Sequence, residues 1–246
     1  MSGFFAEEDQ ISGNEIRIVS PQDVRHLTRV LRAARGDRVR VSDSAEWEYE
    51  TEFLRVQDGA AVLRILDRQR SAREPSVRIS LFQGLPKGAK MDEIIRKSTE
   101  LGVACILPVA CVRSIATGEA VSAHKLARWR KISAEAAKQC RRSLAPEVRP
   151  ALSFEAALAE MRGFEVMLFP YENEGERSLK SCLRGLAKKP ESVALIIGPE
   201  GGFSREEAEA LVSAGAASVS LGRTILRTET AGPAAVAMIL YEWEQD

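Results

Sequence analysis

The sequence predicts an α/β protein in which a small β-rich domain precedes a larger domain built on a parallel sheet. Two observations support this prediction. Before residue 75 the apolar residues fall in short alternating runs separated by glycines, a pattern typical of antiparallel strands. From residue 77 onward, short continuous apolar runs alternate with longer helical segments, as in buried parallel strands joined by helices.

The first domain, residues 1–74, is expected to form a small barrel or sandwich. Its predicted strands are residues 15–20, 37–43, 49–56 and 60–67. One helix interrupts them, because Ser20, Pro21 and Asp23 resemble a capped helix start and an apolar stripe follows. The stripe consists of Val24, Leu27, Val30 and Leu31. A polar linker at residues 68–76 marks the domain boundary.

The second domain, residues 75–246, alternates strands with helices. Its predicted strands are residues 77–83, 103–109, 164–169, 193–198 and 217–222. Helices are expected at residues 91–102, 123–142 and 231–244. The apolar face of the last helix suits either burial within its own domain or an interface between two subunits.

The composition narrows the class of protein. The 246 residues are 45% hydrophobic and 28% charged, as in ordinary globular proteins. No apolar run is long enough for a membrane span and the start does not resemble a signal peptide, so a cytoplasmic location is expected. The 4 cysteines lie far apart and only 2 histidines accompany them, so neither a disulfide framework nor a metal site is expected.

The net charge is zero, but basic residues gather in two segments. Residues 25–40 contain six arginines and one aspartate, and residues 125–149 contain eight basic residues and two glutamates. Either segment alone suits a solvated helix face. The two together favour contact with a polyanion such as a nucleic acid.

Three loops rich in glycine or polar residues follow predicted parallel strands. Residues 198–203 are GPEGGF, residues 170–176 are PYENEGE and residues 221–232 are LGRTILRTETAG. Because parallel strands end at one edge of a sheet, these loops are expected to meet there and to hold a ligand. They lack the glycine fingerprint of dinucleotide-binding proteins, the phosphate-loop lysine and the hydrolase nucleophile elbow. A nucleotide-dependent oxidoreductase is therefore disfavoured.

Two of these segments also carry a family resemblance. Residues 196–211, IIGPEGGFSREEAEAL, and residues 220–240, SLGRTILRTETAGPAAVAMIL, resemble the SPOUT class of S-adenosylmethionine-dependent RNA methyltransferases. With residues 85–109, 128–148 and 26–39, nearly the whole chain is similar to the RsmE family. That family methylates N3 of a uridine, uridine 1498, in 16S ribosomal RNA. The resemblance implies S-adenosylmethionine as the cofactor, the small ribosomal subunit as the partner, and a homodimer without metal or membrane.

The resemblance also implies where the cofactor binds. In the SPOUT class the C-terminal segment threads through a loop to form a deep trefoil knot, and this knot is the cofactor pocket. The implied cofactor-binding residues are Gly198, Pro199, Glu200, Gly201, Leu221, Gly222, Ile225, Leu226, Arg227 and Thr230. Backbone groups would hold the adenine, and the apolar side chains would enclose it.

The chemistry of the implied reaction suggests catalytic residues. Uridine N3 keeps its proton at neutral pH, so the proton must leave and the uracil must gain negative charge before methylation. Arg227 is expected to stabilise that charge, and Glu229 or Glu172 to accept the proton. An ion pair that only orients Arg227 is an equally good role for Glu229. Arg223 is expected to touch RNA phosphate or solvent.

The first domain resembles the small PUA-like β-barrel with which this family holds RNA. The expected RNA-binding residues are Arg25, Arg29, Arg32, Arg128, Arg141 and Arg142. His26 is expected to be packed or capping rather than to face RNA. Gly3 replaces an arginine common in the family, so one basic contact is missing there or supplied elsewhere. The alternatives are a SPOUT ribose 2′-O-methyltransferase and a noncatalytic RNA-binding protein.

Overall fold

The structure is a computed structural model that describes residues 3–43, 47–70, 74–114 and 121–244. The chain divides into two compact units. Unit 1 comprises Met1–Glu74 and Ala137–Ala145, and unit 2 comprises Pro75–Ala136 and Pro146–Asp246. The linker expected at residues 68–76 lies partly outside the described residues, and its first residues continue a strand of unit 1.

Unit 1 is built on a six-stranded sheet with the order β1-β4-β5-β6-β3-β2. The strands are β1 (Gly3–Phe5), β2 (Ile11–Ser12), β3 (Glu15–Ile18), β4 (Arg38–Ser42), β5 (Trp47–Gln57) and β6 (Ala60–Arg70). All neighbours are antiparallel except β1 and β4. Strands β3 to β6 are the four that the sequence predicts. Their alternating apolar residues, including Ile16, Ile18, Val41 and Leu63, form the core of this unit.

The helix predicted after Ser20 is short and changes its winding. Helix α1 (Pro21–Arg25) passes into a single π-helical turn, η2 (His26–Val30). The Ser20 hydroxyl accepts a hydrogen bond from the Asp23 N–H at 3.3 Å, which caps the helix as the sequence predicts.

The wider π-helical turn explains why the predicted apolar stripe fails. Leu27 is fully buried, but Val30 and Leu31 are 65% and 45% exposed, so the prediction of one regular amphipathic helix is wrong. An extra residue per turn rotates the positions after Leu27 away from the core. The His26 ring packs on Phe4, with 5.9 Å between ring centroids, which agrees with the packed role expected for it.

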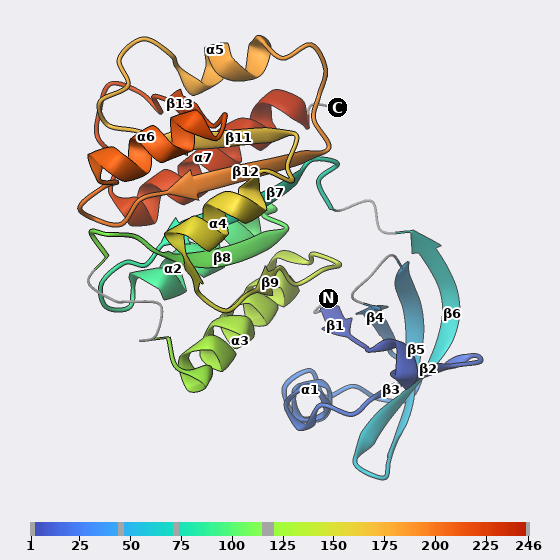
Figure 1. The fold of residues 1–246 in the computed structure, drawn as a ribbon. Helices are drawn as coiled ribbons and strands as arrows, with labels where there is room; N and C mark the ends of the chain where they lie inside the picture. The colour runs from blue at the N-terminus through green and yellow to red at the C-terminus, as the bar shows by residue number, and fades with distance from the viewer. Residues whose placement is uncertain (1–2, 44–46, 71–73, 115–120, 245–246) are drawn as a thin grey trace. The chain divides into compact units, whose positions relative to one another are not determined.

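Unit 2 contains a seven-stranded sheet in which all paired strands run parallel (Figure 1). Its order is β10-β8-β7-β12-β11-β13, and β9 pairs with β8. The strands are β7 (Arg78–Gly84), β8 (Cys105–Ala110), β9 (Glu147–Val148), β10 (Leu152–Ser153), β11 (Val166–Pro170), β12 (Ser192–Ile197) and β13 (Ala217–Val219). The α/β class with a parallel sheet is confirmed.

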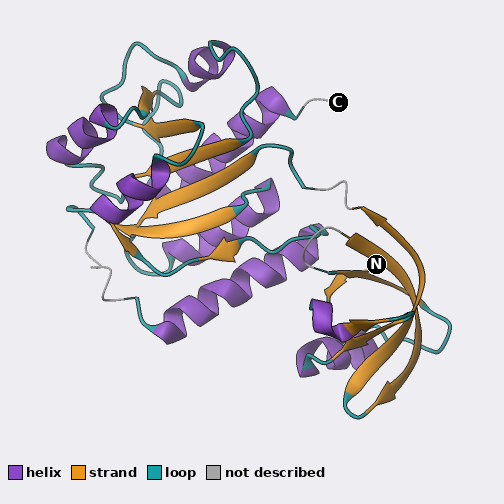
Figure 2. Cartoon of the chain, turned by 45° about the vertical axis from the view of Figure 1, so that its right-hand side comes forward, coloured by secondary structure: helices purple, strands orange, loops and turns teal. Residues whose placement is uncertain are grey.

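Helices cover both faces of this sheet (Figures 1 and 2). They are α2 (Lys90–Leu101), α3 (Ala123–Cys140), α4 (Phe154–Met161), α5 (Leu179–Arg184), α6 (Arg205–Ser213) and α7 (Thr228–Trp243). On one face α2, α5 and α7 pack with Leu81 and Leu195, and on the other α4 and α6 pack with Phe82 and Ile196. Because strand side chains alternate and both faces are covered, the strands read as continuous apolar runs.

The C-terminal part of α3 and the turn after it belong to unit 1 through polar contacts. Lys138 Nζ donates to both carboxylate oxygens of Asp23, at 2.7 and 2.9 Å. Arg142 Nε donates to Glu74 at 3.1 Å, and the Ser143 N–H donates to the same carboxylate at 3.0 Å. Sequence periodicity does not predict this association, because it rests on polar side chains distant in the sequence.

Helix α7 lies against the sheet at a position where only a small residue fits. A Cβ atom on Gly232 would lie 3.3 Å from Gln83 Oε1 and 3.5 Å from Leu81 Cδ2. Pro233 follows inside the helix and removes one backbone donor. The buried residues Ala235, Val236, Ile239 and Leu240 place most of the apolar face in the core of unit 2. Neither α7 nor another helix of the described residues is long and apolar enough to cross a membrane.

Candidate active site

Loops meet at the carboxyl edge of the unit 2 sheet, where the parallel strands end. Gly84 ends β7 so close to the loop after β12 that a Cβ there would lie 2.6 Å from Pro199 N and 2.9 Å from Gly198 C. The loop after β11 is joined to the loop after β13, because the Ser220 N–H donates to Arg177 O at 2.8 Å. Backbone therefore approaches backbone directly, which requires glycine at residue 84.

The loops after β11 and β12 are also in contact. The Glu172 carboxylate lies over Gly202, where a Cβ would be 2.8 Å from Glu172 Oε1. Gly202 has φ +67°, a conformation that favours glycine. These contacts confirm that the three loops expected from the sequence meet at one edge of the sheet.

A buried chain of hydrogen bonds fixes the loop after β12 to the start of α7. Gln83 is fully buried, and its Nε2 donates to Thr228 Oγ1 at 2.9 Å. The Thr228 hydroxyl in turn donates to Gly198 O at 2.7 Å. Buried polar groups normally need partners, so the three groups hold each other in place.

A cluster of charges lies beside this chain of hydrogen bonds. Lys90 Nζ is 2.9 Å from Glu200 Oε1 and 3.5 Å from Glu229 Oε2. The Lys87 N–H donates to Glu200 Oε1 at 3.1 Å. The hydrogen bond to Glu200 is the main cause that raises the pKa of the Lys90 ammonium above its ordinary value. The ammonium therefore stays charged throughout the neutral range.

Arg227 precedes α7 and leads into its first turn. Its carbonyl accepts hydrogen bonds from the N–H groups of Thr230 and Ala231, both at 2.8 Å. Its guanidinium is exposed and makes no hydrogen bond or ion pair within the described part of the chain. The ion pair between Glu229 and Arg227 considered from the sequence is wrong, because Glu229 pairs with Lys90 instead.

The remaining residues expected around the cofactor lie in the same loops. Gly222 has φ +144°, and the space where its Cβ would stand is open. Ile225 is 82% exposed, an unusual position for a large apolar side chain. Leu221 and Leu226 are partly buried and pack against the core of unit 2. An exposed apolar residue beside open backbone suits a loop that covers a ligand.

The RNA methyltransferase domain model matches residues 73–240, more than half of the chain. Ribosomal RNA small subunit methyltransferase E from Bacillus subtilis is 32% identical over 250 residues, which cover 99% of this chain and 98% of the relative. The chain belongs to this methyltransferase family.

Two solved structures resemble this family member over nearly their full length. One is the crystal structure of a ribosomal RNA small subunit methyltransferase E from Neisseria gonorrhoeae bound to S-adenosyl methionine. It has a TM-score of 0.87 and 30% identity, and the alignment covers 99% of this chain and 98% of that one. The other is a putative methyltransferase from Legionella pneumophila in complex with the bound cofactor SAM. It has a TM-score of 0.85 and 29% identity, with 98% of each chain covered.

In this methyltransferase the two basic segments differ in how many of their side chains form ion pairs within the chain. In residues 25–40, Arg38 pairs with Glu50 at 3.6 Å, and the described residues give the other arginines of the segment no ion pair. Arg25, Arg29 and Arg32 are exposed. This segment therefore offers free cationic groups to a partner.

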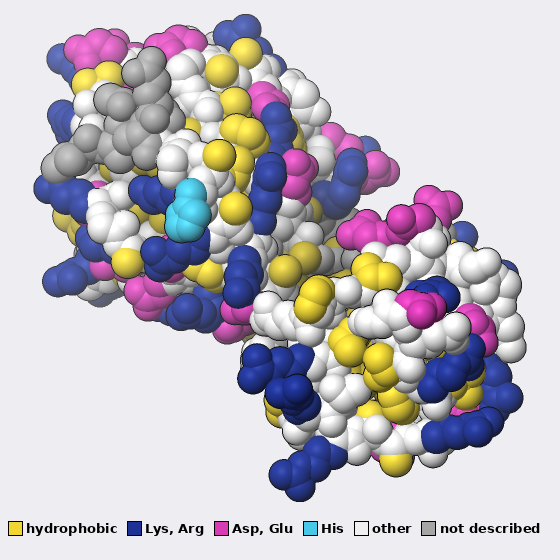
Figure 3. All heavy atoms as spheres, turned by 90° about the horizontal axis from the view of Figure 1, so that it is seen from below, with side chains coloured by type: hydrophobic (Ala, Val, Ile, Leu, Met, Phe, Trp, Pro, Cys, Tyr) yellow, Lys and Arg dark blue, Asp and Glu magenta, His cyan; other side chains and the backbone are white. Residues whose placement is uncertain are grey.

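In residues 125–149 most basic side chains already have partners within the chain. The ion pairs are Arg128 with Asp92, Lys131 with Glu135, Lys138 with Asp23, Arg142 with Glu74 and Arg149 with Glu160. On the face drawn in Figure 3, dark-blue basic groups and magenta acidic groups occur on both units. Arg142 is only 8% exposed, so the prediction that it contacts RNA is wrong: its guanidinium is committed to Glu74. Arg128 and Arg141 are exposed.

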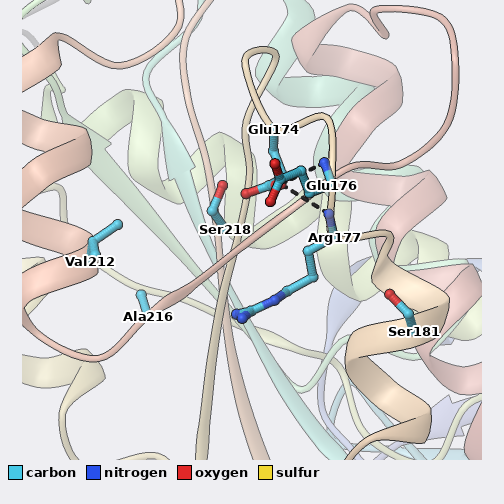
Figure 4. Close-up of a pocket in the computed structure, with 7 residues that line it drawn as sticks. All are labelled: Glu174, Glu176, Arg177, Ser181, Val212, Ala216 and Ser218. Atoms are coloured by element: carbon cyan, nitrogen blue, oxygen red, sulfur yellow. Dashed lines mark hydrogen bonds between the residues drawn. The ribbon is translucent and has the colours of Figure 1, made fainter.

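A hollow of about 510 Å³ opens beside β13 and contains none of the expected site residues (Figure 4). It is lined by Glu174, Glu176, Arg177, Ser181, Val212, Ala216 and Ser218. The Glu174 carboxylate accepts hydrogen bonds from the N–H groups of Arg177 and Glu176, at 2.9 and 3.0 Å, and these bonds lower its pKa. The hollow thus reflects a turn that holds the loop after β11 in shape.

Sequence reasoning missed several residues that build the site. Gln83, Gly84 and Lys90 lie at or after the end of β7, and Arg113 Nη1 donates to Gly201 O at 2.8 Å. The detectable signal was the polar segment at residues 85–90, LPKGAK, which follows a predicted parallel strand and so belongs to the same edge.

Proposed function

We propose that this chain transfers a methyl group from S-adenosylmethionine to N3 of a uridine in 16S ribosomal RNA of the small ribosomal subunit. The observation that carries the proposal is Arg227, whose exposed guanidinium lacks a partner among the described residues where the loops meet. Family membership supports the RNA substrate, and two similar structures with S-adenosylmethionine support the cofactor.

The loops around Gly198 and Gly222 fit such a cofactor. Thr228 holds the Gly198 carbonyl in place, and the space where a Cβ of Gly222 would stand is open. Ile225 would lose its unusual exposure by covering an adenine ring. The other proposed ligands are Pro199, Glu200, Gly201, Leu221, Leu226, Arg227 and Thr230. The cofactor supplies an activated methyl group on a positively charged sulfur, so no metal is needed.

The uracil must be deprotonated at N3 and held in line with the methyl group. Arg227 is proposed to donate hydrogen bonds to a uracil oxygen and to stabilise the negative charge that develops there. Glu172 is the proposed proton acceptor, because its carboxylate is exposed at the edge where the loops meet. Glu229 is the weaker candidate, since Lys90 already neutralises part of its charge.

Unit 1 is proposed to be a PUA-like barrel that holds the RNA through its free arginines. Arg25, Arg29 and Arg32 would contact phosphates, with Arg128 and Arg141 as further contacts. As in the SPOUT class, the C-terminal segment is proposed to form a deep trefoil knot around the cofactor. The enzyme is proposed to work as a homodimer, for which Met238 and Tyr241 on α7, 41% and 75% exposed, offer apolar surface.

Transfer of labelled methyl groups to bacterial small ribosomal subunits that lack the modification tests this function. The product nucleoside is identified by mass spectrometry. We expect 3-methyluridine. Methyl label on ribose would replace the proposal by ribose 2′-O-methylation, and binding of RNA without binding of S-adenosylmethionine would favour a noncatalytic RNA-binding protein.

A further inference from the structure

We propose that Lys90 is a positioning residue of the cofactor site, which fixes the loop after β12 to the first turn of α7. The inference rests on the proposed function, because it assigns this role within the proposed methyltransferase site. Lys90 is the first residue of α2, and its ammonium lies between two carboxylates from different elements. Glu200 comes from the loop after β12, and Glu229 comes from α7.

Lys90 pairs with one partly exposed carboxylate and with one that is largely buried. The side chains of Lys90, Glu200 and Glu229 are 34%, 26% and 14% exposed. Glu229 Oε2 is buried and has no hydrogen bond among the described residues, so the Lys90 ammonium at 3.5 Å provides its charge compensation. A buried carboxylate without a counter-charge lowers the stability of the folded protein. In addition, two carboxylates that share one ammonium lie close enough to repel each other when that ammonium is lost.

The position of this cluster links it to the proposed cofactor ligands. Glu200 lies between Pro199 and Gly201, and Glu229 lies between Thr228, which binds Gly198 O, and Thr230. Lys90 therefore links the same two segments that the buried Thr228 hydrogen bond links, through a second set of contacts. Loss of its charge would let the two carboxylates separate and would shift the backbone that faces the cofactor.

The test compares Lys90→Met, Lys90→Arg and Lys97→Met for S-adenosylmethionine binding by calorimetry and for methyl-transfer kinetics. Lys97 is a matched control on the same helix, because its exposed ammonium pairs only with Glu93, at 2.6 Å, among the described residues. Lys90→Met is expected to raise the Kd for the cofactor about tenfold or more, because it leaves the buried Glu229 carboxylate uncompensated beside the proposed ligands. Lys90→Arg should restore most of the affinity, and Lys97→Met should leave it unchanged.

Two further variants separate positioning from folding. Glu229→Gln added to Lys90→Met should recover part of the cofactor affinity, because the uncompensated charge is gone. Glu229→Gln by itself, which keeps the side-chain volume and removes one of the two carboxylates paired with Lys90, should raise the Kd if Lys90→Met does not fold. If the wild type binds S-adenosylmethionine and the Lys90 and Glu229 variants bind it equally well, the positioning role is overturned. If the wild type binds none, the proposed function itself fails.

Discussion

At the scale of single residues, the Thr228 hydroxyl joins the side chain of Gln83 to the carbonyl of Gly198. Thr228→Val keeps the shape but removes the acceptor of one Gln83 hydrogen bond and the donor to the Gly198 carbonyl, which costs about 1–3 kcal/mol. We expect a lower free energy of unfolding and weaker S-adenosylmethionine binding. Calorimetry and denaturant unfolding measure both quantities.

Thr51→Val is the matched control for that change. Thr51 is also fully buried, and its hydroxyl donates to Val39 O at 2.7 Å in unit 1. This variant should lose stability to a similar degree while binding the cofactor like the wild type. Equal weakening of cofactor binding by both variants would contradict a local role for Thr228.

Sequence patterns predict the position of a residue well when that position depends on neighbouring residues in the sequence. Arg227 and Glu172 both lie in loops that follow parallel strands, β13 and β11, as the sequence predicts. Lys90 was not predicted, since its partner Glu200 lies 110 positions away. Arg142 was misread for the same reason: composition marks it as a free cation, but Glu74 pairs with it.

At the scale of elements, the closest approach in the site is that of Gly84 to the loop after β12. Gly84→Ala would place a methyl group 2.6 Å from Pro199 N. Because the contact is with backbone, relieving it would require the loop after β12 to move. We expect loss of cofactor binding and a clear fall in melting temperature. Gly175→Ala is the control, because a Cβ there has nothing within 4 Å; an equally harmless Gly84→Ala would contradict the described packing.

A second prediction at this scale concerns the basic segment of unit 1, residues 25–40. Replacing Arg25, Arg29 and Arg32 together by alanine should weaken RNA binding and flatten its dependence on salt concentration, because each lost phosphate contact lowers the slope by about one. Lys131→Ala, which removes a charge already paired with Glu135, should change the slope less. Filter binding at several salt concentrations compares them, and identical slopes for all proteins would exclude this segment from the RNA interface.

The positions of the long strands were easier to predict from the sequence than the winding of the first helix. The buried parallel strands stand out as apolar runs, and β7, β8, β11, β12 and β13 all appear where the patterns place them. Strands β9 and β10 have only two residues each, too few to show any period. The π-helical turn at His26–Val30 also escapes prediction, because periodicity assumes regular winding.

At the scale of the whole molecule, the chain forms two compact units, for which different roles are proposed: RNA holding for unit 1 and catalysis for unit 2. Unit 1 carries the exposed residues Arg25, Arg29 and Arg32, which have no ion pair among the described residues, and unit 2 carries the loops that meet at the sheet edge. The change of pattern near residue 75 reveals this division in the sequence. It does not reveal that Ala137–Ala145 groups with unit 1, because that depends on contacts such as Lys138 with Asp23.

The most direct test of the account is the methyl-transfer rate of Arg227→Ala beside that of Arg223→Ala, with both Kd values for S-adenosylmethionine measured. Arg227→Ala should lower kcat about a hundredfold or more, as for the loss of a donor to a developing negative charge. Its cofactor Kd should change much less than kcat, because Arg227 is proposed to contact the cofactor through its backbone, which the variant keeps. Arg223→Ala should keep kcat near that of the wild type. Equal kcat values for the two variants would contradict the central claim that Arg227 stabilises the uracil anion.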